Sequence, residues 1–234
     1  ALIYWQRKEE QSLEVREDTE FRWLLLDGVV QSVLRHTAPD ELCLPHQQIL
    51  RALLPAHAEQ VLHLGLGGGD FLRWLHHRYP GVQQTAIDLN QQVIHLYQRF
   101  FQQAEQPQLH AQDAFAWLNT NQQPYDLILI DLFSDDGSPA PLFQAETYQQ
   151  LQNNMTADGK VIVNLLPRTE QEWQRVQQLL AHCGEVRSVP NLEQRLREAE
   201  RIRGLPHQRD QRDERGERDG RGWRRSGSSG QRSE

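Results

Sequence analysis

Short apolar runs alternate with stretches of helical periodicity between residues 61 and 182. The runs are typical of buried parallel strands and predict strands at 61–64, 82–87, 109–111, 125–131 and 160–165. Between them, apolar residues spaced three or four apart predict helices at 71–78, 91–103, 114–118, 143–153 and 169–182. Strands and helices that alternate in this way predict an α/β fold, with a mostly parallel sheet covered by helices on both faces.

The N-terminal residues show a different pattern, which predicts antiparallel strands. Polar and apolar residues alternate over 12–16, an apolar run covers 21–26, and a second run, 29–33, follows the dipeptide Asp27-Gly28. Asp-Gly between two such runs is a strong hairpin signal. We therefore expect a small N-terminal β-hairpin region over residues 1–44, ahead of a helix from Pro45 to Leu54.

The stretch VLHLGLGGGD, residues 61–70, predicts a strand, a glycine turn and the start of a helix. Gly65, Gly67 and Gly69 alternate in it, where positive φ and a close approach of the backbone to a ligand both require glycine. The dinucleotide fingerprint Gly-x-Gly-x-x-Gly does not fit, because its last glycine is Asp70 here. The spacing instead resembles the first motif of class I S-adenosylmethionine-dependent transferases. We expect a Rossmann-like nucleoside-binding domain over residues 45–190.

Four acidic residues fall at or near the expected carboxyl ends of strands, where open parallel sheets bind ligands: Asp70, Asp88, Asp113 and Asp131. Asp88 suits the two hydroxyls of a ribose, and Asp113 suits the exocyclic amine of adenine. Asp131 ends the clearest buried strand and is the candidate for the reacting centre. Each carboxylate also has an alternative role as a helix N-cap.

The distribution of charge along the chain indicates which classes of partner to expect. The net charge of −7 is the sum of −11 on residues 1–194 and +4 on residues 195–234, which hold 12 arginines and 8 acidic residues. An acidic body disfavours nucleic acid as a partner and favours a cationic substrate. The polar composition after residue 191 predicts a disordered tail over 191–234.

The two cysteines, Cys43 and Cys183, lack metal-ligand spacing and predict a reducing compartment without a structural metal. No apolar run is long enough to cross a membrane, and the first residues lack a basic-then-apolar signal, so we expect a cytoplasmic protein.

Over residues 12–190 the chain resembles the spermidine synthase-like proteins, the polyamine aminopropyltransferases and their relatives. In addition to the glycine turn, the resemblance rests on these segments: Leu26-Asp27-Gly28-Val29-Val30-Gln31, Pro45-His46-Gln47, Asp88-Leu89-Asn90, Gln112-Asp113-Ala114, Tyr125-Asp126 through Asp131, and Ser138-Pro139-Ala140-Pro141-Leu142-Phe143.

The resemblance implies decarboxylated S-adenosylmethionine as the donor and a small amine such as putrescine as the acceptor. It implies that Gln31 contacts the aminopropyl end of the donor, that Asp88 binds ribose, and that Asp113 with Ala114 binds adenine. By the same resemblance, Asp131 accepts the proton of the attacking amine, which must be deprotonated to attack. It also implies an acceptor side that includes His46, Asp70 and Asp135, and assembly as a homodimer.

Some positions depart from the family pattern and leave two alternatives open. Gly68 stands where the family has a substrate-side Asp, and Pro45-His46-Gln47-Gln48 replaces Tyr-His-Glu-Met. Loss of acceptor carboxylates suits an S-adenosylmethionine-dependent methyltransferase on the same frame. The second alternative is a catalytically inert nucleoside-binding homologue.

Overall fold

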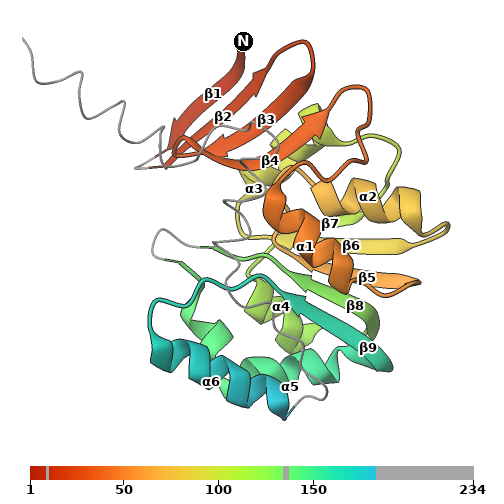
Figure 1. Ribbon diagram of the computed structural model, residues 1–234, viewed down its shortest axis with the longest axis vertical. Helices are drawn as coiled ribbons and strands as arrows, with labels where there is room; N and C mark the ends of the chain where they lie inside the picture. The colour runs from red at the N-terminus through yellow and green to blue at the C-terminus, as the bar shows by residue number, and fades with distance from the viewer. Residues whose placement is uncertain (9–10, 134–136, 183–234) are drawn as a thin grey trace, which may run out of the picture.

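The computed structural model describes residues 1–8, 11–133 and 137–182. The tail expected over 191–234 lies outside these residues. The described chain forms two sheets, one antiparallel and one parallel, with helices on both faces of the parallel sheet (Figure 1).

The N-terminal sheet has four antiparallel strands in the order β1-β2-β3-β4. They are β1 (Leu2–Lys8), β2 (Gln11–Glu17), β3 (Phe21–Leu26) and β4 (Val29–Arg35). Asp27 and Gly28 join β3 to β4 with φ angles of 49° and 76°, the positive values that a tight hairpin turn requires. The sequence pattern predicted the three later strands individually but not β1, whose YWQRK sequence does not alternate cleanly.

The second sheet has five parallel strands in the order β7-β6-β5-β8-β9. Their bounds are β5 (Gln60–Leu64), β6 (Gln83–Asp88), β7 (Gln108–Ala111), β8 (Tyr125–Ile130) and β9 (Met155–Val163). This sheet confirms the expected Rossmann-like α/β class. The chain runs outward from β5 to β7 and then returns to the other side of β5 as β8. The strand order therefore reverses between β5 and β8, and open α/β sheets bind ligands at such a reversal.

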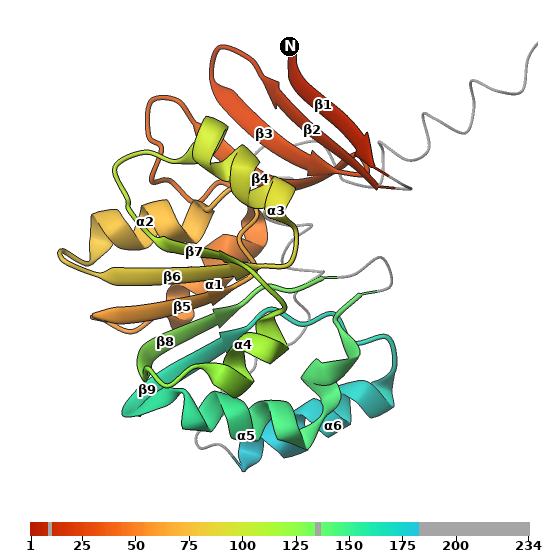
Figure 2. The same ribbon diagram turned by 180° about the vertical axis from the view of Figure 1, so that it is seen from behind.

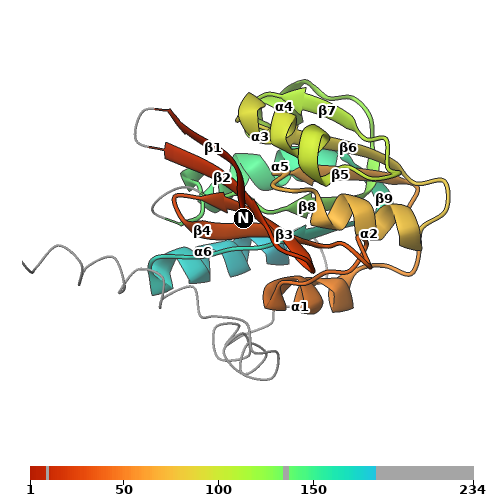
Figure 3. The ribbon, with the colours of Figure 1, turned by 90° about the horizontal axis from the view of Figure 1, so that it is seen from above.

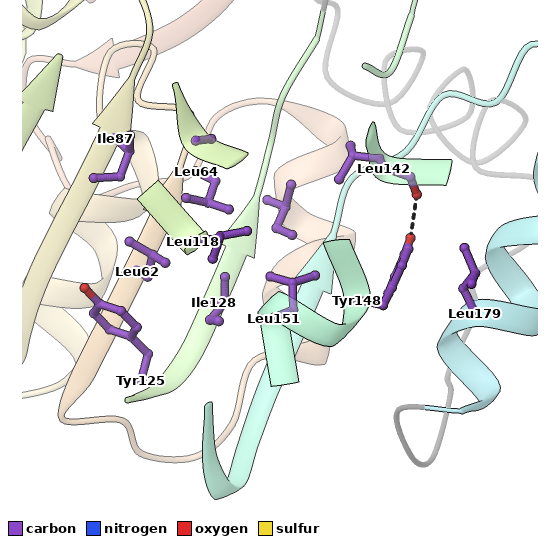
Figure 4. Packing of buried hydrophobic residues seen from close by; sticks show 12 residues of the cluster. Leu62, Leu64, Ile87, Leu118, Tyr125, Ile128, Leu142, Tyr148, Leu151 and Leu179 are labelled. Carbon is purple, nitrogen blue, oxygen red and sulfur yellow. Dashed lines mark hydrogen bonds between the residues drawn. The ribbon is translucent and has the colours of Figure 1, made fainter. Parts of the chain in front are cut away.

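Helices pack on opposite faces of the parallel sheet because alternate residues of each strand point to opposite sides. Val61, Leu127 and Leu129 belong to a buried cluster with residues of α1 (Pro45–Leu53) and α2 (Asp70–Arg78). Leu62 and Ile128 belong to the cluster beneath α4 (Ala114–Thr120), α5 (Ala145–Asn153) and α6 (Glu170–Ala181). Figure 2 shows α4 on the face opposite α1 and α2. Figure 4 shows this second cluster, in which the Tyr148 hydroxyl donates to the Leu142 carbonyl at 2.9 Å.

The antiparallel sheet packs against α2, α3 (Gln91–Leu96) and the π-helical turn η1 (Tyr97–Phe101). Leu13, Val15 and Leu24 of this sheet share one buried cluster with Tyr97 and Phe101. Figure 3 shows the sheet from above, lying over the domain that contains the parallel sheet. The N-terminal strands are thereby held beside the glycine turn.

Three predicted elements differ in detail from the observed ones. The helix expected over 91–103 is α-helical only to Leu96, after which the Gln102 amide donates to the Tyr97 carbonyl and forms the π turn. The helix expected from 143 begins at Ala145, after a 3₁₀ turn η2 (Ala140–Phe143). Strand β9 begins at Met155 rather than Lys160, because Met155 already pairs with Tyr125 of β8, and residues 156–159 form an irregularity before the pairing resumes at Lys160 and Leu127.

Candidate nucleoside site at the carboxyl edge of the sheet

The glycine turn lies at the end of β5, and its three alternate glycines all have positive φ. The angles are 97° at Gly65, 53° at Gly67 and 72° at Gly69, and Gly69 is the N-cap of α2. A Cβ atom on Gly65 would overlap the carbonyl oxygen of Asp131. The turn therefore packs directly against the end of β8, at the point where the strand order reverses.

Asp88, the last residue of β6, is bonded to the same turn. Its Oδ2 accepts a hydrogen bond from the Leu66 amide at 3.1 Å, and its Oδ1 accepts one from the Asn90 amide at 2.8 Å. Burial raises the pKa of this carboxyl above its usual range, while the surrounding backbone N–H groups act in the opposite direction. The carboxylate is thus fixed in orientation at the edge of the sheet, half-buried beside the turn.

Asp131 follows β8 on the other side of the turn, and its side chain is exposed. The Asn164 side-chain amide donates to Asp131 Oδ1 at 3.0 Å, and the Asn164 backbone amide donates to the Ile130 carbonyl at 2.8 Å. Asn164 is therefore fixed to β8 by its backbone and orients the carboxylate with its side chain. The sequence reasoning missed Asn164, because this residue falls inside the strand expected over 160–165, whereas the observed β9 (Met155–Val163) ends directly before it.

Asp113 and Ala114 begin α4 at the same edge. Asp113 is exposed and caps the helix, since its Oδ1 accepts from the Ala116 amide at 2.8 Å. Asp113 therefore has the helix N-cap role that was its alternative to binding a ligand. Ala114 is buried beneath the cap.

Gln31 lies in the N-terminal sheet, directly before a residue that contacts the glycine turn. It is half-buried in β4, and its side-chain amide donates to the Val29 carbonyl at 3.4 Å. Its neighbour Ser32 accepts a hydrogen bond from the Gly68 amide at 2.7 Å. Because β4 is bonded to the glycine turn, the N-terminal sheet forms part of this candidate site.

Comparison with known proteins decides the family. Residues 46–194 match the family model described as the spermine/spermidine synthase domain. The chain belongs to the spermine/spermidine synthase family, which confirms the expected resemblance.

Curated relatives include aminopropyltransferases and a methyltransferase. The polyamine aminopropyltransferase of Neisseria meningitidis serogroup A is 27% identical over 157 residues, which cover 64% of this chain and 60% of that protein. The eEF1A lysine and N-terminal methyltransferase of Xenopus laevis is 30% identical over 128 residues, covering 50% of this chain and 18% of that protein. The chain thus spans less than two thirds of each relative.

Solved structures share the fold at low sequence identity. A probable spermidine synthase from Corynebacterium glutamicum aligns with a TM-score of 0.59 and 18% identity, over 69% of this chain and 63% of that one. Human methyltransferase-like protein 13 in complex with SAH aligns with a TM-score of 0.53 and 21% identity, over 70% of this chain and 95% of that one.

The side chain of Asp70 is buried and makes its contacts inside the protein. Its side chain is 3% exposed, and its Oδ1 pairs with Arg73 Nη2 at 2.6 Å. Its Oδ2 accepts from Gln47 Nε2 at 2.6 Å and from the Val33 amide at 3.3 Å. All of these contacts are internal, so the substrate contact expected for Asp70 stays a prediction that this arrangement does not support.

Arg73 extends the same network to the glycine turn. Its guanidinium donates to the carbonyl oxygens of Gly68, of Phe101 at 3.3 Å and of Pro39 at 2.8 Å. The peptides around Gly68 are therefore held by Ser32 on one side and by Arg73 on the other.

The remaining expected site residues lie as follows. His46 is half-buried in the first turn of α1, directly before Gln47. Asp135 lies outside the described residues. In the part of the chain that the structure describes, no group of three or more His, Cys, Asp or Glu side chains gathers that could hold a metal ion. Nor is any described helix both long and apolar enough to span a membrane.

Exposed apolar side chains mark the strand ends in addition to the carboxylates. Leu89 directly follows β6 and is 76% exposed, Phe133 follows β8 at 47%, and Leu166 follows β9 at 50%. The sequence reasoning did not single them out. An apolar side chain beside Asp88 offers a contact surface for the flat face of a nucleobase whose ribose meets the carboxylate.

Proposed function

We propose that this chain binds a sulfonium nucleoside at the carboxyl edge of the parallel sheet and transfers its aminopropyl group to a small amine. The observation that carries the proposal is the juxtaposition of Gly65, Asp88 and Asp131 across the reversal in strand order. Asp88 contacts the glycine turn through the Leu66 amide, and the turn packs against the Asp131 carbonyl. Family membership supports the same function.

The expected site residues other than Asp70 have the following roles in this proposal. Asp88 accepts hydrogen bonds from the ribose hydroxyls, while Asp113 and Ala114 border the adenine. Gln31 borders the aminopropyl end of the donor. Leu89 is added to this set, because it follows Asp88 and is exposed. His46 and Asp135 are proposed for the acceptor side, and the exposed Asp131 carboxylate takes the place proposed for Asp70, whose contacts are internal.

The proposed reaction is a displacement at carbon. The nitrogen lone pair of the amine attacks the methylene carbon beside the sulfonium sulfur, forming a C–N bond. The C–S bond breaks, and its electron pair remains on sulfur, which becomes a neutral thioether. The amine proton passes to the Asp131 carboxylate, which Asn164 orients through its hydrogen bond of 3.0 Å. Alignment of the nitrogen with the departing sulfur supplies much of the remaining acceleration.

Methyl transfer from S-adenosylmethionine is the second candidate. The observation that favours it is the identity of 30% to the Xenopus methyltransferase over 128 residues. Gly68, which stands in place of the family's substrate-side Asp, also removes one carboxylate that would bind a diamine. The two candidates share the donor site and differ in the acceptor.

Two calorimetric titrations distinguish the candidates, one with decarboxylated S-adenosylmethionine and one with the intact donor. Aminopropyl transfer predicts tighter binding of the decarboxylated form by at least about tenfold, or roughly 1.4 kcal/mol. The reverse preference favours methyl transfer. Binding of neither donor by a chain that is folded by circular dichroism contradicts both transferase candidates. Asp88→Ala is the matched control, and it should abolish whichever signal is seen.

We further propose that the protein assembles as a homodimer and is located in the cytoplasm. The family resemblance and the cysteine content motivate it, and light scattering of the purified full chain tests the assembly state. A single peak at the monomer mass of 27.3 kDa would contradict the dimer.

A further inference from the structure

A pocket lined in part by residues of α4 lies away from the candidate nucleoside site. It has a volume of about 360 Å³, and its eight lining residues come from β7, from α4 and from the segment that leads into β8. Gln108 and Tyr125, the first residues of β7 and β8, both line it. The pocket therefore lies toward the amino ends of these strands, whereas Asp88 and Asp131 lie at the carboxyl ends.

Three of the residues that line this pocket each carry a buried polar atom without a hydrogen-bond partner. Among the residues that the structure describes, four buried side-chain nitrogen or oxygen atoms have no hydrogen-bond partner. Three of them belong to residues that line the pocket: His110 Nε2, Trp117 Nε1 and the Tyr125 hydroxyl. Tyr125 is only 1% exposed, and Figure 4 shows it at the end of the buried cluster opposite Leu179. Unpartnered buried polar atoms are rare and unfavourable, so their concentration at one cavity indicates that a ligand completes them.

The lining chemistry selects the ligand class. No lining residue is acidic, and none is lysine or arginine; Gln108, Gln122 and Gln123 also line the pocket, while the Asn121 side-chain amide donates to the Gln123 carbonyl and to Asn154. The Trp117 indole can only donate, so it requires an acceptor oxygen or nitrogen, while the Tyr125 hydroxyl donates and accepts. The His110 and Trp117 rings pack with centroids 4.4 Å apart and form an aromatic wall. Neutral donors and acceptors beside an aromatic wall match a ring that carries several hydroxyl groups.

We propose that this pocket binds a small neutral polyhydroxylated ring, the chemistry shared by a free monosaccharide and by the ribose of a nucleoside. Its volume of about 360 Å³ lies within the range of small-molecule sites. The proposal does not rest on the transferase reaction, since none of its residues takes part in the candidate nucleoside site.

The test is a titration of the full chain followed by the tryptophan indole N–H signals in ¹H–¹⁵N spectra. The chain has six tryptophans, and the Trp117 signal is identified by its absence in Trp117→Phe. The probes are D-ribose, D-glucose and adenosine, each used up to about 50 mM or its solubility limit, because a small open site binds in the millimolar range. Asp88→Ala serves as the protein background, so that adenosine at the nucleoside site does not contribute.

A saturable shift of the Trp117 signal with ribose or glucose supports a free-sugar ligand, and a shift with adenosine alone supports a nucleoside. No saturable shift with any probe overturns the proposal and leaves solvent water as the partner of the three atoms.

Tyr125→Phe provides a second, independent test. It removes only the unpartnered hydroxyl, so we expect the affinity for the active probe to fall at least about fivefold. The melting temperature without probe should stay unchanged or rise, because the variant loses a buried polar group that has no partner. A lower melting temperature with unchanged probe affinity would show that the hydroxyl serves folding and would overturn its assignment to a ligand. Donor affinity at the nucleoside site should not change.

Discussion

Gln47 donates its side-chain amide to Asp70 Oδ2 at 2.6 Å, so that helix α1 is bonded to the first residue of helix α2 in the protein interior. The other carboxylate oxygen, Oδ1, pairs with Arg73, and Arg73 in turn donates to the Gly68 carbonyl. The conformation of the glycine turn therefore depends on a buried ion pair that also contacts β4 through the Val33 amide. Sequence position alone would have assigned this carboxylate to a substrate.

Asp70→Asn should destabilise the protein strongly, because it leaves the Arg73 charge buried without an anionic partner. Removal of one member of a buried ion pair costs about 3–5 kcal/mol, and Arg73 is 2% exposed. Urea denaturation measures the loss. Asp40→Asn is the matched control: Asp40 faces His77 at 3.7 Å on the surface, and its replacement should change the free energy of unfolding by less than about 1 kcal/mol.

The double variant that combines Asp70→Asn with Gln47→Glu returns a carboxylate to the same buried hydrogen bond from the other side. We expect it to regain part of the lost stability, since an amide and a carboxylate would still meet between α1 and α2 and the charge of the network would again be balanced. A double variant as unstable as the sum of its two single substitutions would contradict this account.

Gly65→Ala should abolish donor binding and lower stability by more than backbone strain alone explains. Alanine at positive φ costs about 1–2 kcal/mol, and its Cβ would also overlap the Asp131 carbonyl oxygen. Gly81→Ala supplies the matched control, because Gly81 has a φ of 82° but nothing within 4 Å of an added Cβ. Melting curves and donor titrations of both variants measure the difference. Equal effects of the two substitutions would show that the close approach at Gly65 is unimportant.

Asp131→Asn should lower kcat by about 10²–10⁴-fold while donor affinity stays close to that of the wild type, because an amide cannot accept the proton of the amine as a carboxylate does. The side chain is exposed, so the fold should tolerate the change. Asn164→Ala should produce a smaller loss of kcat, because it removes the hydrogen bond that orients Asp131 but keeps the carboxylate. Steady-state kinetics with putrescine as the acceptor tests both, and an unchanged kcat in Asp131→Asn would exclude it as the base.

The sequence predicted the elements whose patterns are local. Strand β5, the glycine turn and Asp88 follow one another within a single βαβ unit, and periodicity and glycine spacing were enough to identify them. The polar segment at the start of β9 lacks such a pattern, because among the described strands β9 pairs with β8 alone and its first residues bury few side chains. Its pairing with β8 depends on a neighbour thirty residues away in the chain.

Contacts between distant segments account for what the sequence missed in the site. Asp70 and Asp88 stand beside strand ends in the same way, yet the first is directed toward Gln47 and the second toward Leu66. The positions of α1 and β4, both distant from Asp70 in the chain, contribute to that difference. Asn164 orients Asp131 because β9 pairs with β8, and no local sequence pattern around Asn164 predicts that pairing.

The stability of the protein should decrease on acidification between about pH 6.5 and pH 4, because of His63. Its ring is 4% exposed in β5, and its Nε2 lies 3.0 Å from Gln84 Oε1. Burial lowers the pKa of this histidine to about 4, whereas the Gln84 contact acts in the opposite direction. The pKa of this histidine in the unfolded chain is about 6.5. Between pH 6.5 and pH 4 the unfolded chain therefore binds a proton at His63 that the native chain does not bind, so unfolding is favoured as the pH falls.

His63→Gln tests this assignment, because glutamine can still donate to Gln84 but does not titrate. Urea denaturation at several pH values should show a shallower decline for His63→Gln than for the wild type, with a difference in slope approaching about 1.4 kcal/mol per pH unit. The raised pKa of Asp88 contributes in the opposite sense, since the native carboxyl gains a proton first, but it contributes equally to both proteins. His57→Gln is the control, because His57 is 63% exposed and its replacement should leave the slope unchanged. Parallel pH profiles for His63→Gln and the wild type would assign the acid sensitivity to other groups.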